Sequence, residues 1–190
     1  MTRAWTLLAG IMLTAGCVTP YGEGQRALSQ GRYGQAATYF TQALAEEPRR
    51  SDALLGLGLA QYKQGEFADA AGTLERAVVE RPNDPTSHLY LGLSYLQQGD
   101  AFKTEEQLTA LRALKIDPRM SQQIERALDV LRAEPLSEPI RAFVAGSLET
   151  EAALLREAQQ ARLDAQRSFY YAPSPYPCLL VRRGGRFFCI

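Results

Sequence analysis

The chain has 190 residues, of which 46% are hydrophobic and 22% charged, and its 21 basic side chains balance its 21 acidic ones. This length fits one globular domain with a short appendage, and this hydrophobic fraction excludes a chain that is disordered throughout. A net charge of zero argues against a dedicated nucleic-acid binder, because such proteins carry an excess of Lys and Arg. With one His and three Cys, the chain offers few side chains for a zinc or His-based catalytic site. We therefore expect no metal, no cofactor and no enzymatic activity.

Residues 1–16 predict a signal peptide, because Arg3 precedes an apolar run over 4–13 that small residues follow. The run is roughly half of the about 20 residues that a membrane-spanning helix needs. The sequence Leu-Thr-Ala-Gly-Cys at 13–17 resembles the bacterial lipobox, which implies that Cys17 is lipidated and becomes the new N-terminus. Val18 stands where an Asp would resemble an inner-membrane retention signal, which implies an outer-membrane anchor facing the periplasm. The alternative is a plain signal peptide in which Cys17 has no role.

A self-similarity with a period of 34 residues follows this segment, since Pro48 and Pro82 share that spacing with Gly31 and Gly65. Such a period is typical of helical hairpins that bury their apolar faces only against neighbouring hairpins. We predict three units over 17–50, 51–84 and 85–118, closed by a capping helix over 119–133. Further pairs at this spacing are Ala36 and Ala70, Phe40 and Leu74, Ala43 and Ala77, Leu57 and Leu91, Gly58 and Gly92, Gln64 and Gln98, and Gly65 and Gly99.

The middle unit resembles the tetratricopeptide repeat along its whole length. Gly58 and Ala70 would let two antiparallel helices approach closely, Gly65 would turn the chain between them, and Pro82 would end the second helix. The resemblance implies an all-α fold of stacked helical hairpins. The residues that carry it are Leu54, Leu57, Gly58, Tyr62, Gly65, Phe67, Ala70, Leu74, Ala77 and Pro82.

The outer units depart from this pattern. The first unit has a short leading helix, about Tyr21 to Gln30, since Pro20 stands where a large apolar residue is usual. In the third unit, the stretch that ends at Pro118 is longer by two residues than the corresponding stretch of the middle unit. We therefore expect an insertion in its second helix, with Thr104 or Glu106 at the close-packed position that Ala70 fills in the middle unit.

Two further helices are predicted after the repeats. Residues 121–132 place apolar side chains at helical spacing and form the expected capping helix. Residues 134–168 predict a long amphipathic helix, with Ser137 as N-cap and Pro139 in its first turn. The apolar stripe of this long helix consists of Ile140, Phe143, Val144, Leu148, Ala152, Leu155 and Ala158.

Residues 169–190 predict a linker rich in Pro and Tyr, followed by a β-hairpin over two short apolar runs. We expect Val181 to pair with Arg186, a register that places Cys178 opposite Cys189 and allows a disulfide in an oxidising periplasm. The alternative is a redox or ligand-binding role for this Cys pair. The spacing is not Cys-x-x-Cys, which favours a structural disulfide.

Function is expected on the concave side, where the family resemblance implies that the first helices of successive units hold a partner protein. The predicted groove is mostly aliphatic, and it lacks the Lys and Asn that relatives binding chaperone carboxylates have in place of Leu55 and Leu59. Its residues are Gln25 and Leu28 from the first unit, Leu55, Leu59, Tyr62 and Lys63 from the second, and Leu89, Leu93, Leu96 and Gln97 from the third.

Six exposed leucines would be an aggregation liability, so we expect something to cover them. The cover is either an apolar helix of a partner or the chain's own helix over 139–167, unless these leucines simply pack between neighbouring helices. The partner would be an envelope protein, since small lipoproteins with such repeats include pilotins for type IV pilus secretins and organisers of envelope assembly. A third hypothesis is a structural lipoprotein that self-associates through the long helix.

Two isolated features have simpler explanations. His88 stands where the family often has a bulky aromatic residue, so we expect it to be a packed side chain rather than a ligand. The Gly56-Leu57-Gly58 sequence lacks the third glycine and the preceding strand of a nucleotide loop, and it is interpreted as helix packing.

Overall fold

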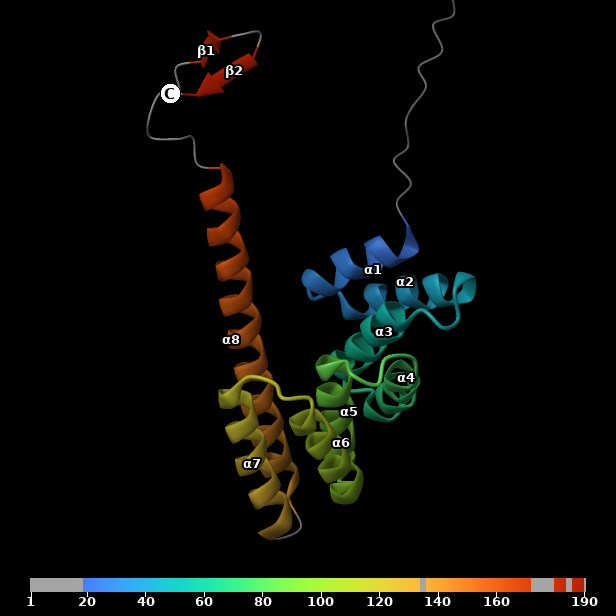
Figure 1. The fold of residues 1–190 in the computed structure, drawn as a ribbon. Coiled ribbons are helices and arrows are strands. Elements are labelled where there is room, and N and C mark those ends of the chain that lie inside the picture. Colours follow the sequence, from blue (N-terminus) through green and yellow to red (C-terminus); the bar gives the residue numbers. More distant parts are fainter. Residues whose placement is uncertain (1–18, 134–135, 172–179, 184–185, 190) are drawn as a thin grey trace, which may run out of the picture. The chain divides into compact units, whose positions relative to one another are not determined.

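The computed structural model describes residues 19–133, 136–171, 180–183 and 186–189, with side chains over 19–133 and 136–167. The chain divides into two compact units, Met1–Gly146 and Ser147–Ile190. The first contains the repeats and the start of the long helix, and the second contains the rest of that helix and a two-stranded sheet. Figure 1 shows the order of these elements.

The first unit is an array of antiparallel helical hairpins. Successive helices from α1 to α6 pack against one another, and α1 and α5 also each contact α3. The predicted all-helical fold of stacked hairpins with a long C-terminal helix is confirmed. The helices are α1 (Pro20–Ser29), α2 (Tyr33–Glu46), α3 (Ser51–Gln64), α4 (Phe67–Glu80), α5 (Pro85–Gln98), α6 (Ala101–Ala113), α7 (Pro118–Ala133) and α8 (Glu138–Tyr171).

The ends of these helices follow local sequence signals. The side chain of Thr19 accepts a hydrogen bond from the backbone N–H of Gly22 at 3.2 Å, and Pro20 occupies the first turn of α1. The three hairpin turns contain Gly31, Gly65 and Gly99, with φ angles of 71°, 81° and 82°. Only glycine adopts this left-handed conformation without strain, so the 34-residue spacing of these glycines marks equivalent turns.

The core of the first two hairpins is built around Phe40, which is fully buried. A β-carbon at Gly56 would lie 2.4 Å from Cζ of Phe40, and one at Gly24 would lie 2.8 Å from Cε1. The glycines of α1 and α3 therefore make room for one aromatic ring of α2. The rest of this core comprises Ala27, Ala36, Ala43, Leu44, Ala53, Leu54, Ala60 and Ala77.

The third hairpin corrects one prediction. Thr104 and Leu108 of α6 are fully buried, and they stand 34 residues after Ala70 and Leu74 of α4, so no insertion interrupts this part of the helix. The expected insertion is wrong because Pro118 is the first residue of α7, whereas Pro82 follows the end of α4. Proline is favoured both at the start of a helix and just beyond its end, so residue type alone did not distinguish the two positions.

Helix α8 has 34 residues. Of its predicted stripe, Val144 and Leu148 are buried, whereas Phe143 is 76% exposed and Ile140 45% exposed. Among the described residues, no helix combines the length and apolar character needed to cross a membrane.

The two strands of the second unit, β1 (Leu180–Arg183) and β2 (Arg186–Cys189), are antiparallel. Arg183 pairs with Arg186 and Leu180 with Cys189, so the predicted register, with Val181 opposite Arg186, is wrong. The observed register leaves two residues between the strands, the commonest length of a hairpin connection, whereas the predicted one required four. Cys178 lies outside the described residues, so the predicted disulfide stays a prediction.

Candidate functional site

The predicted groove residues of the first two hairpins lie on α1 and α3 and remain partly accessible. On α3, Leu55 and Leu59 are half-buried and Lys63 is exposed, while Tyr62 keeps only 6% of its surface. On α1, Gln25 is exposed and Leu28 is half-buried. Helices α1 and α3 therefore present accessible aliphatic side chains with polar neighbours.

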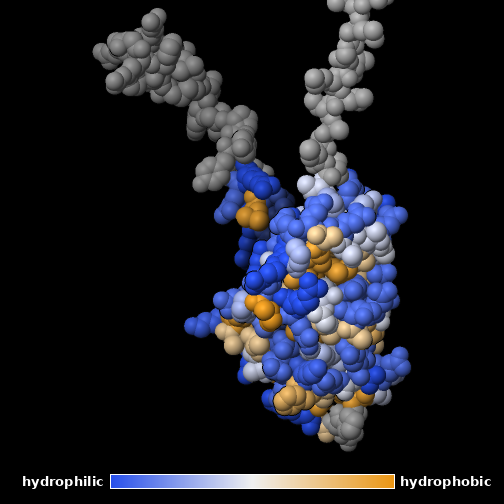
Figure 2. Space-filling model, turned by 90° about the vertical axis from the view of Figure 1, so that its right-hand side faces the viewer, coloured by the Kyte–Doolittle hydropathy of each residue, from blue (hydrophilic) through white to orange (hydrophobic). Residues whose placement is uncertain are grey.

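The predicted groove residues of the third hairpin are largely inaccessible. Leu89, Leu93 and Leu96 of α5 are 4%, 0% and 1% exposed, and only Gln97 is half-buried. Half of the six leucines expected on an open strip are thus buried. Figure 2 shows hydrophobic residues on one face as small separate patches among hydrophilic ones. We call the accessible part of the predicted groove, on α1 and α3, the open half, and the part on α5 the closed half.

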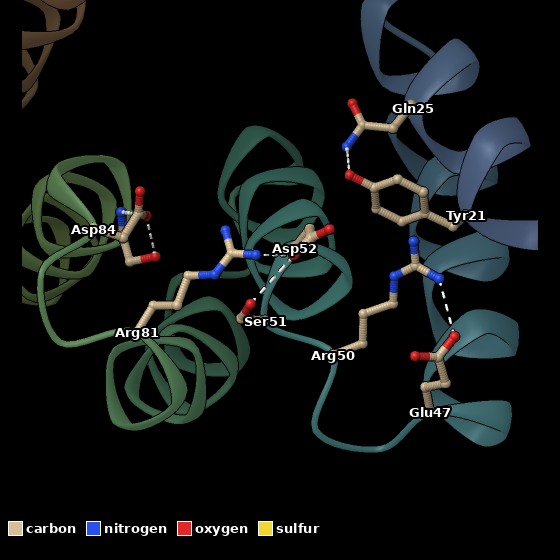
Figure 3. Close-up of polar contacts among 9 residues, drawn as sticks. Tyr21, Gln25, Glu47, Arg50, Ser51, Asp52, Arg81 and Asp84 are labelled. Carbon is tan, nitrogen blue, oxygen red and sulfur yellow. Dashed lines mark hydrogen bonds and ion pairs between the residues drawn. The ribbon is translucent and has the colours of Figure 1, made fainter.

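Tyr21 belongs to the open half, although the sequence analysis did not include it. It stands 34 residues before Leu55 and is half-buried on α1. The guanidinium of Arg50 lies 4.1 Å from the centre of its ring, and Gln25 Nε2 donates a hydrogen bond to its hydroxyl at 3.0 Å (Figure 3). Arg50 also pairs with Glu47 at 3.1 Å. These contacts hold the ring at the start of α1, and the 34-residue period was the signal that could have identified it.

The next hairpin boundary uses different contacts at the equivalent level. Arg81 Nη2 lies 2.5 Å from Oδ1 of Asp52 at the start of α3, and the Ser51 hydroxyl donates to the same oxygen at 3.2 Å (Figure 3). At the start of α5, Asp84 accepts a hydrogen bond from the backbone N–H of Ser87 at 2.7 Å. Partly exposed ion pairs contribute little to stability, so their main effect here is to orient side chains at one end of the open half.

An aromatic cluster separates the open half from the closed half. The rings of Tyr62 and Phe67 are 5.5 Å apart, and those of Tyr62 and Tyr90 are 5.3 Å apart in an edge-on arrangement. Lys63 Nζ lies 5.7 Å from the Tyr62 ring and 6.0 Å from the Tyr90 ring. The cluster therefore places a cation beside an electron-rich surface where α3 meets α5.

Two polar residues of α5 are buried for structural reasons. The hydroxyl of Tyr95 donates a hydrogen bond to Oε1 of Glu75, and burial together with this bond raises the pKa of Tyr95 above its usual range. His88 is 7% exposed, and its ring nitrogens lie 3.0 Å from Gln107 Oε1 and 2.8 Å from the Pro82 carbonyl oxygen. This geometry agrees with the expectation that His88 is a packed side chain.

The remaining predicted sites receive no structural test. Cys17 and Cys178 lie outside the described residues, and Cys189 is the last residue of β2. In the described part of the chain, no three His, Cys, Asp or Glu side chains gather as a metal site would require. What the described residues offer is a surface of aliphatic, aromatic and amide side chains, which suits binding.

Comparison with known proteins agrees with this architecture. The family model for the tetratricopeptide repeat matches residues 21–85 and 60–118, which together span more than half of the chain. The type III secretion translocator chaperone SycD of Yersinia enterocolitica is similar in structure, with a TM-score of 0.56 and 19% identity over 60% of this chain and 81% of that one. No curated protein matches the chain.

Two other solved structures show the same fold. PcrH, in complex with the chaperone binding region of PopD, has a TM-score of 0.56 and 20% identity over 60% of this chain and 89% of that one. The Sgt2 TPR domain from Aspergillus fumigatus has a TM-score of 0.53 and 24% identity over 62% of this chain and 83% of that one. At these identities the likeness concerns the fold alone.

Proposed function

The chain belongs to the tetratricopeptide repeat family, and we propose that it is a lipid-anchored adaptor of the bacterial cell envelope that binds a partner protein through the open half of its groove. The observation that carries this proposal is the difference in accessibility between equivalent side chains. Leu55 and Leu59 are partly accessible, whereas Leu89 and Leu93 are buried. A partner would therefore contact α1 and α3.

The chemistry of the open half supports an apolar partner segment with polar flanks. Leu28, Leu55 and Leu59 provide aliphatic surface, and Tyr21 adds a ring whose position is held by Arg50. Exposed Gln25 adds amide hydrogen-bonding groups beside them. Apolar contacts in such a surface supply affinity, and amide or charged neighbours orient the bound segment. Related folds bind peptides in this general way, as the titles of the PcrH–PopD and SycD–YopD structures state.

Photo-crosslinking in living cells tests the partner proposal. A photoreactive residue at Leu59 should form a covalent adduct with another envelope protein, whereas one at Val79, which is 73% exposed outside the groove, should not. If the adduct at Leu59 joins only residues 139–167 of the same chain, the groove is filled from within and the adaptor proposal is wrong. An equal adduct from Val79 would also contradict it.

The membrane anchor is tested separately at Cys17. Metabolic labelling with an alkyne fatty acid should modify the wild-type chain and leave Cys17→Ala unlabelled, with the variant lost from the membrane fraction. Cys189→Ala is the matched control, because it removes a thiol but leaves residues 13–17 intact. Labelling of Cys17→Ala at the wild-type level would overturn the anchor while leaving the binding proposal standing.

A further inference from the structure

A cavity at the end of the array is separate from the open half. It has a volume of about 540 Å³, within the roughly 300–1,000 Å³ usual for small-molecule sites. Its walls come from the ends of α5 and α7 and the starts of α6 and α8, all within the first unit. The residues that shape it are Leu96, Ala101, Leu131, Arg132, Leu136 and Arg141.

The walls of this cavity are mainly aliphatic. Leu96 is 1% exposed, and Leu131 and Leu136 are half-buried. Ala101 begins α6 and adds only a methyl group. Because these side chains carry no polar atoms, they favour a ligand with an apolar body that leaves water on binding.

The cationic groups of the cavity differ in how they are satisfied. Arg132 is paired, since its Nε donates to Glu105 Oε1 at 2.9 Å. Arg141 donates from Nη1 to the carbonyl oxygen of Leu136 at 2.9 Å, but its Nε is buried and has no hydrogen-bond partner among the described residues. A buried donor without an acceptor is costly, and an anionic oxygen is the acceptor that best satisfies a guanidinium.

We propose that this cavity binds an acyl chain that ends in a carboxylate, with the carboxylate on Arg141 and the chain along the leucines. The combination of one unsatisfied guanidinium with aliphatic walls fits an amphiphile of single negative charge. A neutral alcohol of the same length would match the walls but leave the Arg141 Nε unsatisfied, and a small anion would satisfy Arg141 but leave the walls uncovered.

A photoreactive octanoic acid carrying a diazirine tests this site on the purified full chain. Peptide mapping should place the label on residues 96–101 and 131–141, and unlabelled octanoate should compete at least about tenfold better than octanol, the range of a charge-assisted hydrogen bond. Equal competition by octanol would overturn the proposal. Stronger competition by N-acetylleucine than by octanoate would do so too, since it would assign the site to a peptide C-terminus.

Variants separate the charge from the walls. Arg141→Met should lower labelling by about tenfold, while Arg119→Met, which removes an exposed Arg of α7, should leave it unchanged. Ala101→Phe should block labelling by filling the cavity with the charge intact. Thermal unfolding followed by circular dichroism checks that each variant is folded. Wild-type labelling of Arg141→Met, or labels that map to α1 and α3, would refute the assignment.

Discussion

Helices α3 and α5 hold equivalent places in consecutive repeats, yet they differ in what their groove side chains contact. Leu59 of α3 is half-buried, and Leu93, at the same position one repeat later, has no exposed surface. The consensus position thus predicts the face on which a side chain lies, but not whether that face is covered. Coverage depends on where in the array the repeat stands, because a terminal repeat meets segments that are not repeats.

The internal packing of the two hairpins differs as well. A β-carbon at Gly58 would lie 2.5 Å from Cγ of Leu74, whereas one at Gly92 would lie 3.3 Å from Cβ of Gln107 and 3.4 Å from Cδ2 of Leu108. The second hairpin is therefore the tighter one. Its helices meet through glycine at a distance that excludes a methyl group, while the third hairpin comes close to accommodating one.

The largest effect is expected for a carboxylate in the closed half. Leu93→Glu would bury a charge without a partner, and we expect it to lower the free energy of unfolding by more than about 3 kcal/mol. Leu59→Glu should cost less than about 1 kcal/mol, because its side chain can reach water. Chemical denaturation measures both.

The same pair separates folding from binding. In cells, Leu59→Glu should remain folded and lose the partner that a photoreactive residue at Leu55 captures in the wild-type background. Similar destabilisation by the two variants would show that the difference between the open and closed halves does not persist in solution.

A methyl group added to each hairpin should sharpen the difference in packing. Gly58→Ala should destabilise by about 1–3 kcal/mol, because Leu74 is fully buried and cannot move aside. Gly92→Ala should change stability by less than about 1 kcal/mol, since the gain in helix propensity offsets a milder contact. Thermal unfolding of the two variants measures the contrast, and a Gly92→Ala variant as unstable as Gly58→Ala would contradict it.

The sequence predicted what repeats and missed what depends on the ends of the array. The 34-residue period identified the hairpins and placed Gly31, Gly65 and Gly99 in their turns, because each turn needs the same backbone conformation. The role of Pro118 was mistaken, since a proline before a helix and one after it look alike without the fold.

The candidate site was predicted to the same extent. The spacing of Leu55, Leu59 and Lys63 identified side chains that are accessible on α3. The burial of Leu89, Leu93 and Leu96 could not be predicted, because the 34-residue period does not specify tertiary contacts at the end of the array. The strand register failed for a similar reason, since the apolar runs allow two alignments and loop length selects between them.

A smaller effect is expected from the hydrogen bond between α4 and α5. Tyr95→Phe should lower stability by about 1 kcal/mol at neutral pH by removing the bond to Glu75. Because the pKa of Tyr95 is raised on folding, its contribution is complete below the unfolded pKa of about 10 and is lost as the pH rises above it. The difference between wild type and variant, measured by urea denaturation from pH 7 to pH 11, should therefore shrink at the alkaline end. A constant or growing difference would contradict the raised pKa.

The smallest effect is expected on the outer surface of α4. Gly72 is exposed within the helix, and a β-carbon there would meet nothing within 4 Å. Gly72→Ala should therefore stabilise the chain by about 0.5–1 kcal/mol, because it lowers the entropy of the unfolded state and creates no contact. Combined with Gly58→Ala in one chain, it should add independently, since neither substitution shares a contacting residue with the other. A loss of stability in Gly72→Ala alone would mean that a partner or another part of the chain packs against this surface, which would move the search for the binding site from the open half to α4.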